Sequence, residues 1–235
     1  MCLEISMSSK VELFQNKIRQ SGLNLFACGS IDKIPFSTFF DPFFKGVMIV
    51  GNGGTDFWNF FLREKNVGHK NPIDQFVTNY LEKKLKESGF TSTEFQRFYP
   101  HSDYTPPLLQ ISRHFNLSRP SKLGLDLNPE FGSWFGLRAL FLFKDALPEI
   151  TPHAFESPCE QCTLKPCLTN CPGGVFKNGR FMPEDCSTFR LRENSPCDKK
   201  CDARMACPVG KEHKYSKEQM SYHYEHGLKM LKKLC

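Results

Sequence analysis

Residues 159–172 read Cys159-Glu-Gln-Cys162-Thr-Leu-Lys-Pro-Cys167-Leu-Thr-Asn-Cys171-Pro172, and this stretch carries half of the eight cysteines that crowd the last third of the chain. The other half is more widely spaced, and its final cysteine is again followed directly by proline: Cys186, Cys197, Cys201 and Cys207-Pro208. Thiols that recur at such short intervals belong to a metal or iron–sulfur centre, or to a disulfide framework. The cysteine pattern therefore decides how this part of the chain folds.

Two cubane [4Fe–4S] clusters need eight thiolates, and in bacterial two-cluster ferredoxins the cysteine before proline in each half ligates the cluster of the other half. The chain resembles that pattern, although Cys162-x4-Cys167 and Cys201-x5-Cys207 are longer than the usual spacing. We predict two ligand sets: Cys159, Cys162, Cys167 and Cys207 for one cluster, and Cys171, Cys186, Cys197 and Cys201 for the other. Zinc stays open as an alternative because thiolates also suit it, but two zinc sites would not explain the paired Cys-Pro steps.

The remaining composition indicates a folded, soluble protein. With 235 residues, 40% hydrophobic residues and 23 phenylalanines, the chain is long enough for one core domain and a smaller appended one. No apolar stretch is long enough to cross a bilayer, and the N-terminus lacks the features of a secretory signal. We expect a cytoplasmic protein without a membrane partner, in which disulfides are the weaker interpretation. The other three of the 11 cysteines are expected to be spare thiols: Cys2, Cys28 and Cys235.

The charge distribution bears on the partners of the chain. The formal net charge is +6, from 31 basic and 25 acidic residues, and the lysines are scattered, with a modest run at 83–86. A nucleic-acid-binding protein usually concentrates its positive charge on one face, so we consider a nucleic-acid partner unlikely from this pattern. A basic surface would suit an acidic electron-donor protein.

The first 150 residues alternate helical and strand patterns. Helices are predicted from apolar residues at helical spacing and from capping residues at 11–18, 71–89 and 106–115. Strands are predicted from short apolar runs bounded by turn residues at 23–28, 46–50, 93–99, 123–127 and 137–143. These patterns predict an α+β domain over residues 1–150, with helices packed on a mostly antiparallel or mixed sheet.

Residues 151–235 differ in composition. Prolines recur among the cysteines and are expected to interrupt regular structure, at positions 152, 158, 166, 172, 183, 196 and 208. We therefore predict a small module that is held together by its cofactor rather than by a hydrophobic core. Ser216 and Gln219 resemble a capping box and open an amphipathic helix over residues 216–234.

Two known families resemble different parts of the chain. The cysteine module is similar to the C-terminal iron–sulfur part of epoxyqueuosine reductases, which also carry a Gly-Ser-Trp-Phe segment like residues 132–135 here. Residues 40–145 more closely resemble cobalamin-processing proteins of the CblC type. Residues 71–75, Asn-Pro-Ile-Asp-Gln, resemble their Asp-Pro-Val-Asp-Gln, and residues 128–138 resemble their His-Pro-x-Phe-Gly-x-Trp-Phe-x-Ile-Arg, with Asn128 in place of the histidine.

The resemblance implies a nitroreductase-like, corrinoid-binding α+β domain followed by a ferredoxin-like module with two [4Fe–4S] clusters. The corrinoid, cobalamin, would bind without a lower axial base. Arg138 stands where an arginine helps to bind glutathione in CblC-type proteins, and Asp103 stands where the reductases have a proposed proton donor. Trp134 and Phe135 belong to the shared motif, and Trp134 is a candidate either for stacking on the macrocycle or for the core.

A glycine-rich segment follows the predicted strand at 46–50. Val50-Gly-Asn-Gly-Gly-Thr55 lacks the third glycine of a dinucleotide fingerprint and the Gly-Lys-Ser/Thr of a phosphate-binding loop. A tight turn is the favoured interpretation, because glycine permits close backbone approach. A flat corrin ring needs the same kind of approach, so Gly51, Gly53 and Gly54 are candidates to line it.

Together these patterns predict an oxidoreductase. A reduced flavodoxin, ferredoxin or flavin reductase would donate electrons to the clusters, and the electrons would pass to the cobalt of the corrinoid for cobalamin reduction, upper-ligand removal or a corrinoid-dependent reduction. Two alternatives remain: a ferredoxin-like electron carrier without a corrinoid, and a flavin-binding reductase.

Overall fold

The computed structural model describes residues 5–64, 72–100 and 106–234 and divides the chain into two compact units. The first unit combines Met1–Leu117 with Phe135–Ala154, and the second combines Ser118–Trp134 with Phe155–Cys235. The sequence predicts a domain boundary after residue 150, close to the boundary between Ala154 and Phe155 in the structure. It assigns residues 118–134 to the first domain, however. The structure groups them with the second unit because Leu123 and Trp134 pack into apolar clusters with residues beyond 155.

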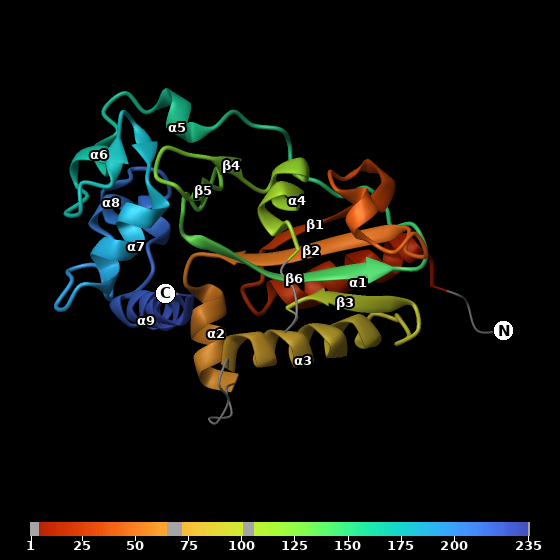
Figure 1. The fold of residues 1–235 in the computed structure, drawn as a ribbon. Coiled ribbons are helices and arrows are strands. Elements are labelled where there is room, and N and C mark those ends of the chain that lie inside the picture. Colours follow the sequence, from red (N-terminus) through yellow and green to blue (C-terminus); the bar gives the residue numbers. More distant parts are fainter. Residues whose placement is uncertain (1–4, 65–71, 101–105, 235) are drawn as a thin grey trace. The chain divides into compact units, whose positions relative to one another are not determined.

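The first unit is built on a four-stranded antiparallel sheet with the strand order β1-β2-β6-β3 (Figure 1). Its strands are β1 (Leu25–Ser30), β2 (Gly46–Gly53), β3 (Phe95–Tyr99) and β6 (Phe135–Phe143). Every residue of β2 is buried, because this strand has a neighbour on each side and apolar residues on both faces. The predicted mixed α+β fold is confirmed for this unit.

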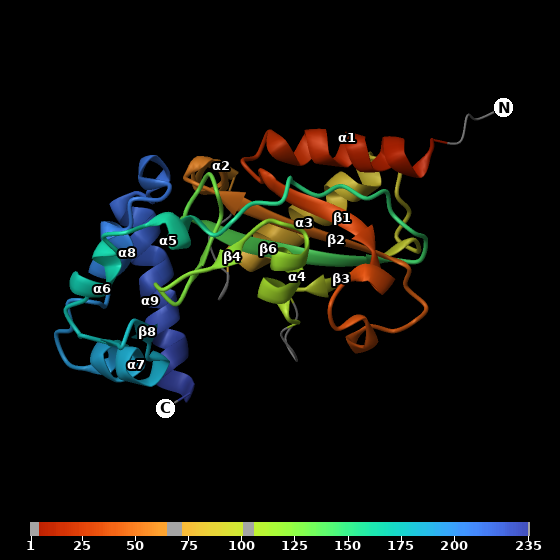
Figure 2. The same ribbon diagram turned by 90° about the horizontal axis from the view of Figure 1, so that it is seen from above.

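Helices cover the sheet. They are α1 (Met7–Arg19), α2 (Asp56–Glu64), α3 (Pro72–Glu87) and α4 (Leu108–His114), with 3-10 turns η1 (Ile31–Lys33) and η2 (Ser37–Phe39). The predicted face of α1 is confirmed, since Val11, Phe14 and Ile18 are buried, and α3 buries a stripe of its own at every fourth residue. In Figure 2, α1 and α4 lie on opposite sides of the sheet.

The second unit consists of short elements. Two small hairpins pair β4 (Arg119–Pro120) with β5 (Asp126–Leu127) and β7 (Phe176–Lys177) with β8 (Arg180–Phe181). The helices are α5 (Pro158–Gln161), α6 (Pro166–Thr169), α7 (Pro183–Leu191), α8 (Asp202–Ala206) and α9 (Lys217–Leu234), with a 3-10 turn η3 (Lys211–His213). The predicted C-terminal helix is confirmed, and its cap is formed by Gln219 N donating to Ser216 Oγ at 3.1 Å.

Two details of the second unit differ from the sequence prediction. The prolines at 158, 166 and 183 start helices instead of interrupting structure, because the fixed φ of proline suits the first helical position. The strand predicted at 123–127 is reduced to Asp126–Leu127, because Gly124 has a φ of +79°, which an extended strand does not adopt.

The second unit also has apolar packing of its own. One cluster joins Leu123, Cys167 and Ala203, and another joins Trp134, Tyr215 and Met220. The prediction of a module held only by its cofactor was therefore too simple. Within the described residues, none of the helices combines the length and the apolar character that a membrane span requires.

Candidate metal centres

The eight clustered cysteines all lie in the second unit, and the short helices distribute them. Cys159 lies in α5, Cys167 in α6 and Cys186 in α7, while α8 runs between Cys201 and Cys207. All eight thiols are free of disulfide bonds. Among the described residues, no three His, Cys, Asp or Glu side chains converge closely enough to hold a single metal ion.

The structure brings four of these thiols into one electrostatic group. Burial raises the pKa of the Cys167 thiol, and the charges of Cys207, Cys159 and Cys162 raise it further. Burial also raises the pKa of Cys207, with further contributions from Cys162 and Cys159. Because charge effects of this kind require proximity, these four side chains lie within reach of one another.

The other four thiols form a second group. Burial raises the pKa of Cys197 to about 11, and the next contributions come from Cys201, Cys171 and Cys186. Burial likewise raises the pKa of Cys186, followed by the charge of Cys201, while Arg190 opposes the rise and Cys171 adds to it. In both groups the thiol neighbours of each shifted cysteine belong to its own set of four.

Backbone amides point at several of these sulfur atoms. Lys122 N donates to Cys159 Sγ at 3.3 Å, and Arg204 N donates to Cys201 Sγ at 3.4 Å. A backbone hydrogen bond associated with Val209 also lowers the pKa of Cys207, against the dominant effect of burial. Amide donors stabilise negative charge on sulfur, and such hydrogen bonds tune iron–sulfur centres.

Trp134 lies in the core of the second unit. Its side chain is fully buried and packs edge-on against the Tyr215 ring at 5.4 Å, and the Arg204 guanidinium lies 4.2 Å from its ring centroid. Both contacts use the aromatic surface that stacking on a macrocycle would need. This geometry favours the core interpretation of Trp134.

The glycines at 51, 53 and 54 do not form a single tight turn, because Gly51 and Gly53 lie in β2. A Cβ atom on Gly51 would lie 2.7 Å from Gly136 O in the neighbouring strand. Gly53 is bracketed by Asn24, whose Oδ1 accepts from Gly53 N at 2.7 Å and whose Nδ2 donates to Gly53 O at 3.2 Å. Gly54 has a φ of +70°, which favours glycine. The turn interpretation is therefore correct for Gly54 alone, and close packing against the neighbouring strand accounts for Gly51.

Arg138 belongs to a polar cluster at one end of the sheet. Its Nε donates to Asn52 Oδ1 at 2.6 Å, and its guanidinium lies 5.6 Å from the Phe57 ring centroid. Burial raises the pKa of Tyr99, the charge of Asp74 raises it further, and Arg138 lowers it. Arg138 itself is half-buried. Phe135, also half-buried, pairs with Gly53 at the start of β6.

Two residues of this cluster, Asn52 and Tyr99, are not among the site residues predicted from the sequence. Asn52 is fully buried, and its Nδ2 has no hydrogen-bond partner among the described residues. Its signal was available: only Gly51 separates Asn52 from the apolar run that ends at Val50, and a buried polar group of this kind needs hydrogen-bond partners. Tyr99 gave no comparable signal.

Three predicted positions cannot be placed. Asp103, Cys2 and Cys235 lie outside the described residues. Cys28, the remaining spare cysteine, is fully buried in β1 and donates from Sγ to Pro148 O at 3.2 Å. Burial raises its pKa from 9.0 to about 12, which disfavours the nucleophilic thiolate form and suits a structural cysteine.

Comparisons with known proteins reveal similarity at the level of structure. No known sequence family matches the chain, and no curated protein matches it. An epoxyqueuosine reductase solved with a tRNA-Tyr stem loop aligns over 92% of this chain and 69% of its own, with a TM-score of 0.61 and 13% identity. The epoxyqueuosine reductase from Bacillus subtilis aligns with a TM-score of 0.58 at 13% identity, over 92% of this chain and 69% of its own.

A second kind of neighbour matches along its whole length. The B12-trafficking protein CblC from C. elegans aligns over 92% of both chains, with a TM-score of 0.51 and 13% identity. At 13% identity these alignments show a shared fold and nothing further. The mixed α+β architecture is thus shared with both kinds of protein that the sequence motifs resemble.

Proposed function

We propose that the second unit holds two [4Fe–4S] clusters and that the protein is a reductase that passes electrons to a base-off corrinoid held by the first unit. The observation that carries the proposal is the separation of the eight thiols into two electrostatic groups of four. Each group contains three cysteines from one half of the cysteine-rich sequence and the Cys-Pro cysteine from the other half. That crossed arrangement is the one found in two-cluster ferredoxins.

The thiol groups fit clusters better than single zinc ions. Zinc binds thiolates at about 2.3 Å, which brings four sulfur atoms to within about 4 Å of one another. The described cysteines do not converge that closely, although they affect one another's charge. A larger multi-metal core with four corner ligands suits this wider spacing. Its positive charge would also offset the burial and repulsion that otherwise keep these thiols protonated.

In the first unit, Arg138 and Asn52 are the best-placed groups to contact a corrinoid. A buried amide N–H without an acceptor is costly, and Asn52 Nδ2 is such a group among the described residues. The amide side chains of a corrinoid carry carbonyl oxygens that accept from N–H donors, and Arg138 adds a second donor beside Asn52. When bound, the clusters would supply one-electron transfer and the corrinoid a reducible cobalt. The chain's own contribution is to hold them and to tune their charge.

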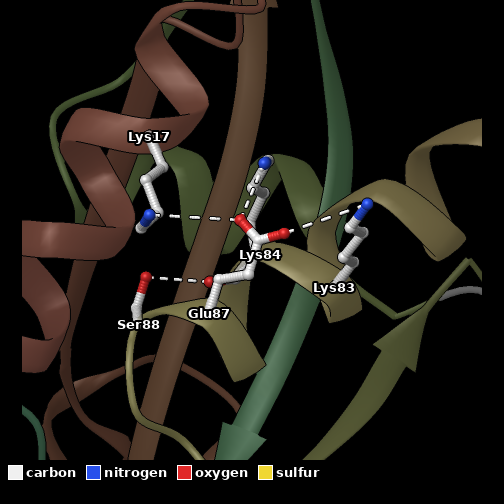
Figure 3. Close-up of polar contacts among 5 residues, drawn as sticks. All are labelled: Lys17, Lys83, Lys84, Glu87 and Ser88. Atoms are coloured by element: carbon white, nitrogen blue, oxygen red, sulfur yellow. Dashed lines mark hydrogen bonds and ion pairs between the residues drawn. The ribbon is translucent and has the colours of Figure 1, made fainter.

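The proposed partners are a small corrinoid and an electron-donor protein such as a flavodoxin, a ferredoxin or a flavin reductase. The tRNA stem loop belongs to one neighbour's structure. Here the lysine run on α3 is partly balanced by Glu87, which pairs with Lys84 at 2.8 Å, Lys83 at 3.9 Å and Lys17 at 4.0 Å (Figure 3). A lysine run that is paired in this way is a weak candidate for an RNA-binding surface.

Iron and acid-labile sulfide analysis of anaerobically reconstituted protein tests the clusters. We expect about eight iron and eight sulfide atoms per chain, and about half of each in Cys167→Ala, which removes one ligand of the first set. Cys28→Ala is the matched control, because it removes a buried cysteine of the first unit and should keep the full iron content. Stoichiometric zinc without sulfide would refute the cluster proposal, and wild-type iron in Cys167→Ala would refute the ligand set.

Spectroscopy separates the corrinoid reductase from its alternatives. Adding cobalamin to the brown, cluster-loaded protein should produce the absorbance change of the base-off form. Brown protein that leaves the cobalamin spectrum unchanged would be an electron carrier without a corrinoid. A yellow, fluorescent extract would identify a flavin-binding reductase.

A further inference from the structure

Arg204 is a buried cation in the middle of the cysteine-bearing unit. It lies in α8, between Cys201 and Cys207, and only 8% of its surface is exposed. Its guanidinium lies 4.2 Å from the Trp134 ring centroid and 5.1 Å from that of Tyr215. The side chain is therefore held in a fixed position by two aromatic rings.

The hydrogen bonds of this guanidinium go to neutral groups. Nε donates to Ser133 Oγ at 3.2 Å, and Nη2 donates to the carbonyl oxygen of Ser133. Among residues 5–64, 72–100 and 106–234, no carboxylate lies within ion-pair distance of Arg204. Removing a guanidinium from water without a counter-charge is expensive, and aromatic faces return only part of that cost. A negative group is thus expected nearby.

The second thiol set is the available counter-charge. The backbone amide of Arg204 donates to Cys201 Sγ at 3.4 Å, so the backbone of this residue lies beside the second thiol set. The Tyr224 side chain lies within electrostatic reach of both Cys201 and the Arg204 guanidinium. A [4Fe–4S] cluster with four thiolate ligands carries a net negative charge, and its reduction by one electron makes that charge larger.

We propose that Arg204 is a charge-compensating residue, beside Arg190, of the cluster held by Cys171, Cys186, Cys197 and Cys201, and that its positive charge raises the reduction potential of that cluster. This inference rests on the proposed presence of clusters. The added electron stays on the cluster, and the fixed cation stabilises the more negative, reduced form more than the oxidised one. Ser133 and Trp134 act on the cluster through Arg204, by holding its side chain in place.

Anaerobic redox titration of the holoprotein, followed by electron paramagnetic resonance, tests this role. In Arg204→Gln, we expect the midpoint potential of one of the two cluster signals to fall by at least about 59 mV. For a one-electron couple this corresponds to a tenfold decrease in the equilibrium constant for reduction. Arg204→Lys keeps the positive charge, so the potential of this cluster should stay close to that of the wild type. Arg192→Gln is the matched control, because it removes the same charge from an exposed arginine of the second unit and should leave both signals in place.

Iron and sulfide content separates the possible failures. Wild-type protein without clusters would overturn the proposed function itself. Clusters that are present in Arg204→Gln with an unshifted potential would overturn the role of Arg204 alone. If Arg204→Gln does not retain its second cluster, Arg204→Lys decides: full iron with a potential near that of the wild type supports the charge, and loss of the cluster there as well refutes it.

Discussion

The substitution Gly132→Ala tests how the second unit brings its cysteines together. Gly132 has a φ of +55°, and a Cβ atom at this position would lie 2.7 Å from the Val209 carbonyl carbon and overlap its oxygen. Gly210 faces it, since a Cβ there would lie 2.5 Å from Gly132 N. Val209 follows Cys207-Pro208 directly. The two glycines therefore let the 128–134 segment approach the backbone that positions Cys207.

The expected cost has two parts. A non-glycine residue in the left-handed region costs about 1–2 kcal/mol, because its Cβ crowds the backbone. Forcing a methyl group into a closely packed site adds about 1–3 kcal/mol. Gly132→Ala should therefore destabilise the protein by about 2–5 kcal/mol. Gly179→Ala isolates the first part, because Gly179 has a φ of +71° but an added Cβ would have no heavy atom within 4 Å.

Thermal unfolding of the anaerobic holoprotein compares the two variants. For a chain of this length, 1 kcal/mol corresponds to about 2–4 °C in Tm, so Gly132→Ala should melt about 2–12 °C below Gly179→Ala. Iron content provides a second readout, because displacement of Val209 should weaken the site of Cys207. Equal melting temperatures and equal iron content would refute the close approach between residues 132 and 209.

Two further predictions concern ionisable groups of the first unit. Burial raises the pKa of Cys28 from 9.0 to about 12, so the folded state retains a proton that the unfolded state loses above pH 9. Unfolding free energy should therefore fall by up to about 1.4 kcal/mol per pH unit above pH 9, and less steeply in Cys28→Ala, as measured by urea unfolding. The Lys84 hydrogen bond lowers the pKa of Glu87, so its stabilisation is present above its unfolded pKa and is lost as the pH falls through the folded one. Because Glu87 is exposed, about 1 M salt should return its pKa toward 4.5 in a nuclear magnetic resonance titration, and an unchanged pKa would contradict this pairing.

Much of the first unit could be predicted because its elements are specified locally. The buried residues of α1 and α3 have the spacing of amphipathic helices, and Pro72 marks the start of α3. The strands β2 and β6 are apolar runs that only a sheet interior accommodates. The order of the strands and the bulge between Val50 and Gly51 depend on long-range pairing, for which a single sequence gives no signal.

The second unit was harder to predict because its contacts are non-local. The 118–134 segment has strand-like residues and follows the first domain in sequence, yet its packing partners lie beyond residue 155. Local patterns contain no information on that pairing. The cysteine spacing leads us to propose two ligand sets, because the Cys-Pro steps carry a known topological rule, and these sets stay a prediction. It gave no indication of Arg204, whose significance depends on its burial and on what surrounds it.

The motif Phe131-Gly132-Ser133-Trp134 acquires a different meaning from these contacts. Gly132 permits the approach to Val209, Ser133 accepts from Arg204, and Trp134 covers the Arg204 guanidinium. Each of these residues thus serves the cysteine unit, whereas Phe135 already belongs to β6 and pairs with Gly53 in the other unit. A substitution within residues 131–134 should accordingly disturb cluster properties before corrinoid binding, and a substitution of Arg138 should do the reverse. If both kinds of change impaired only corrinoid binding, the assignment of this motif to the cysteine unit would be wrong.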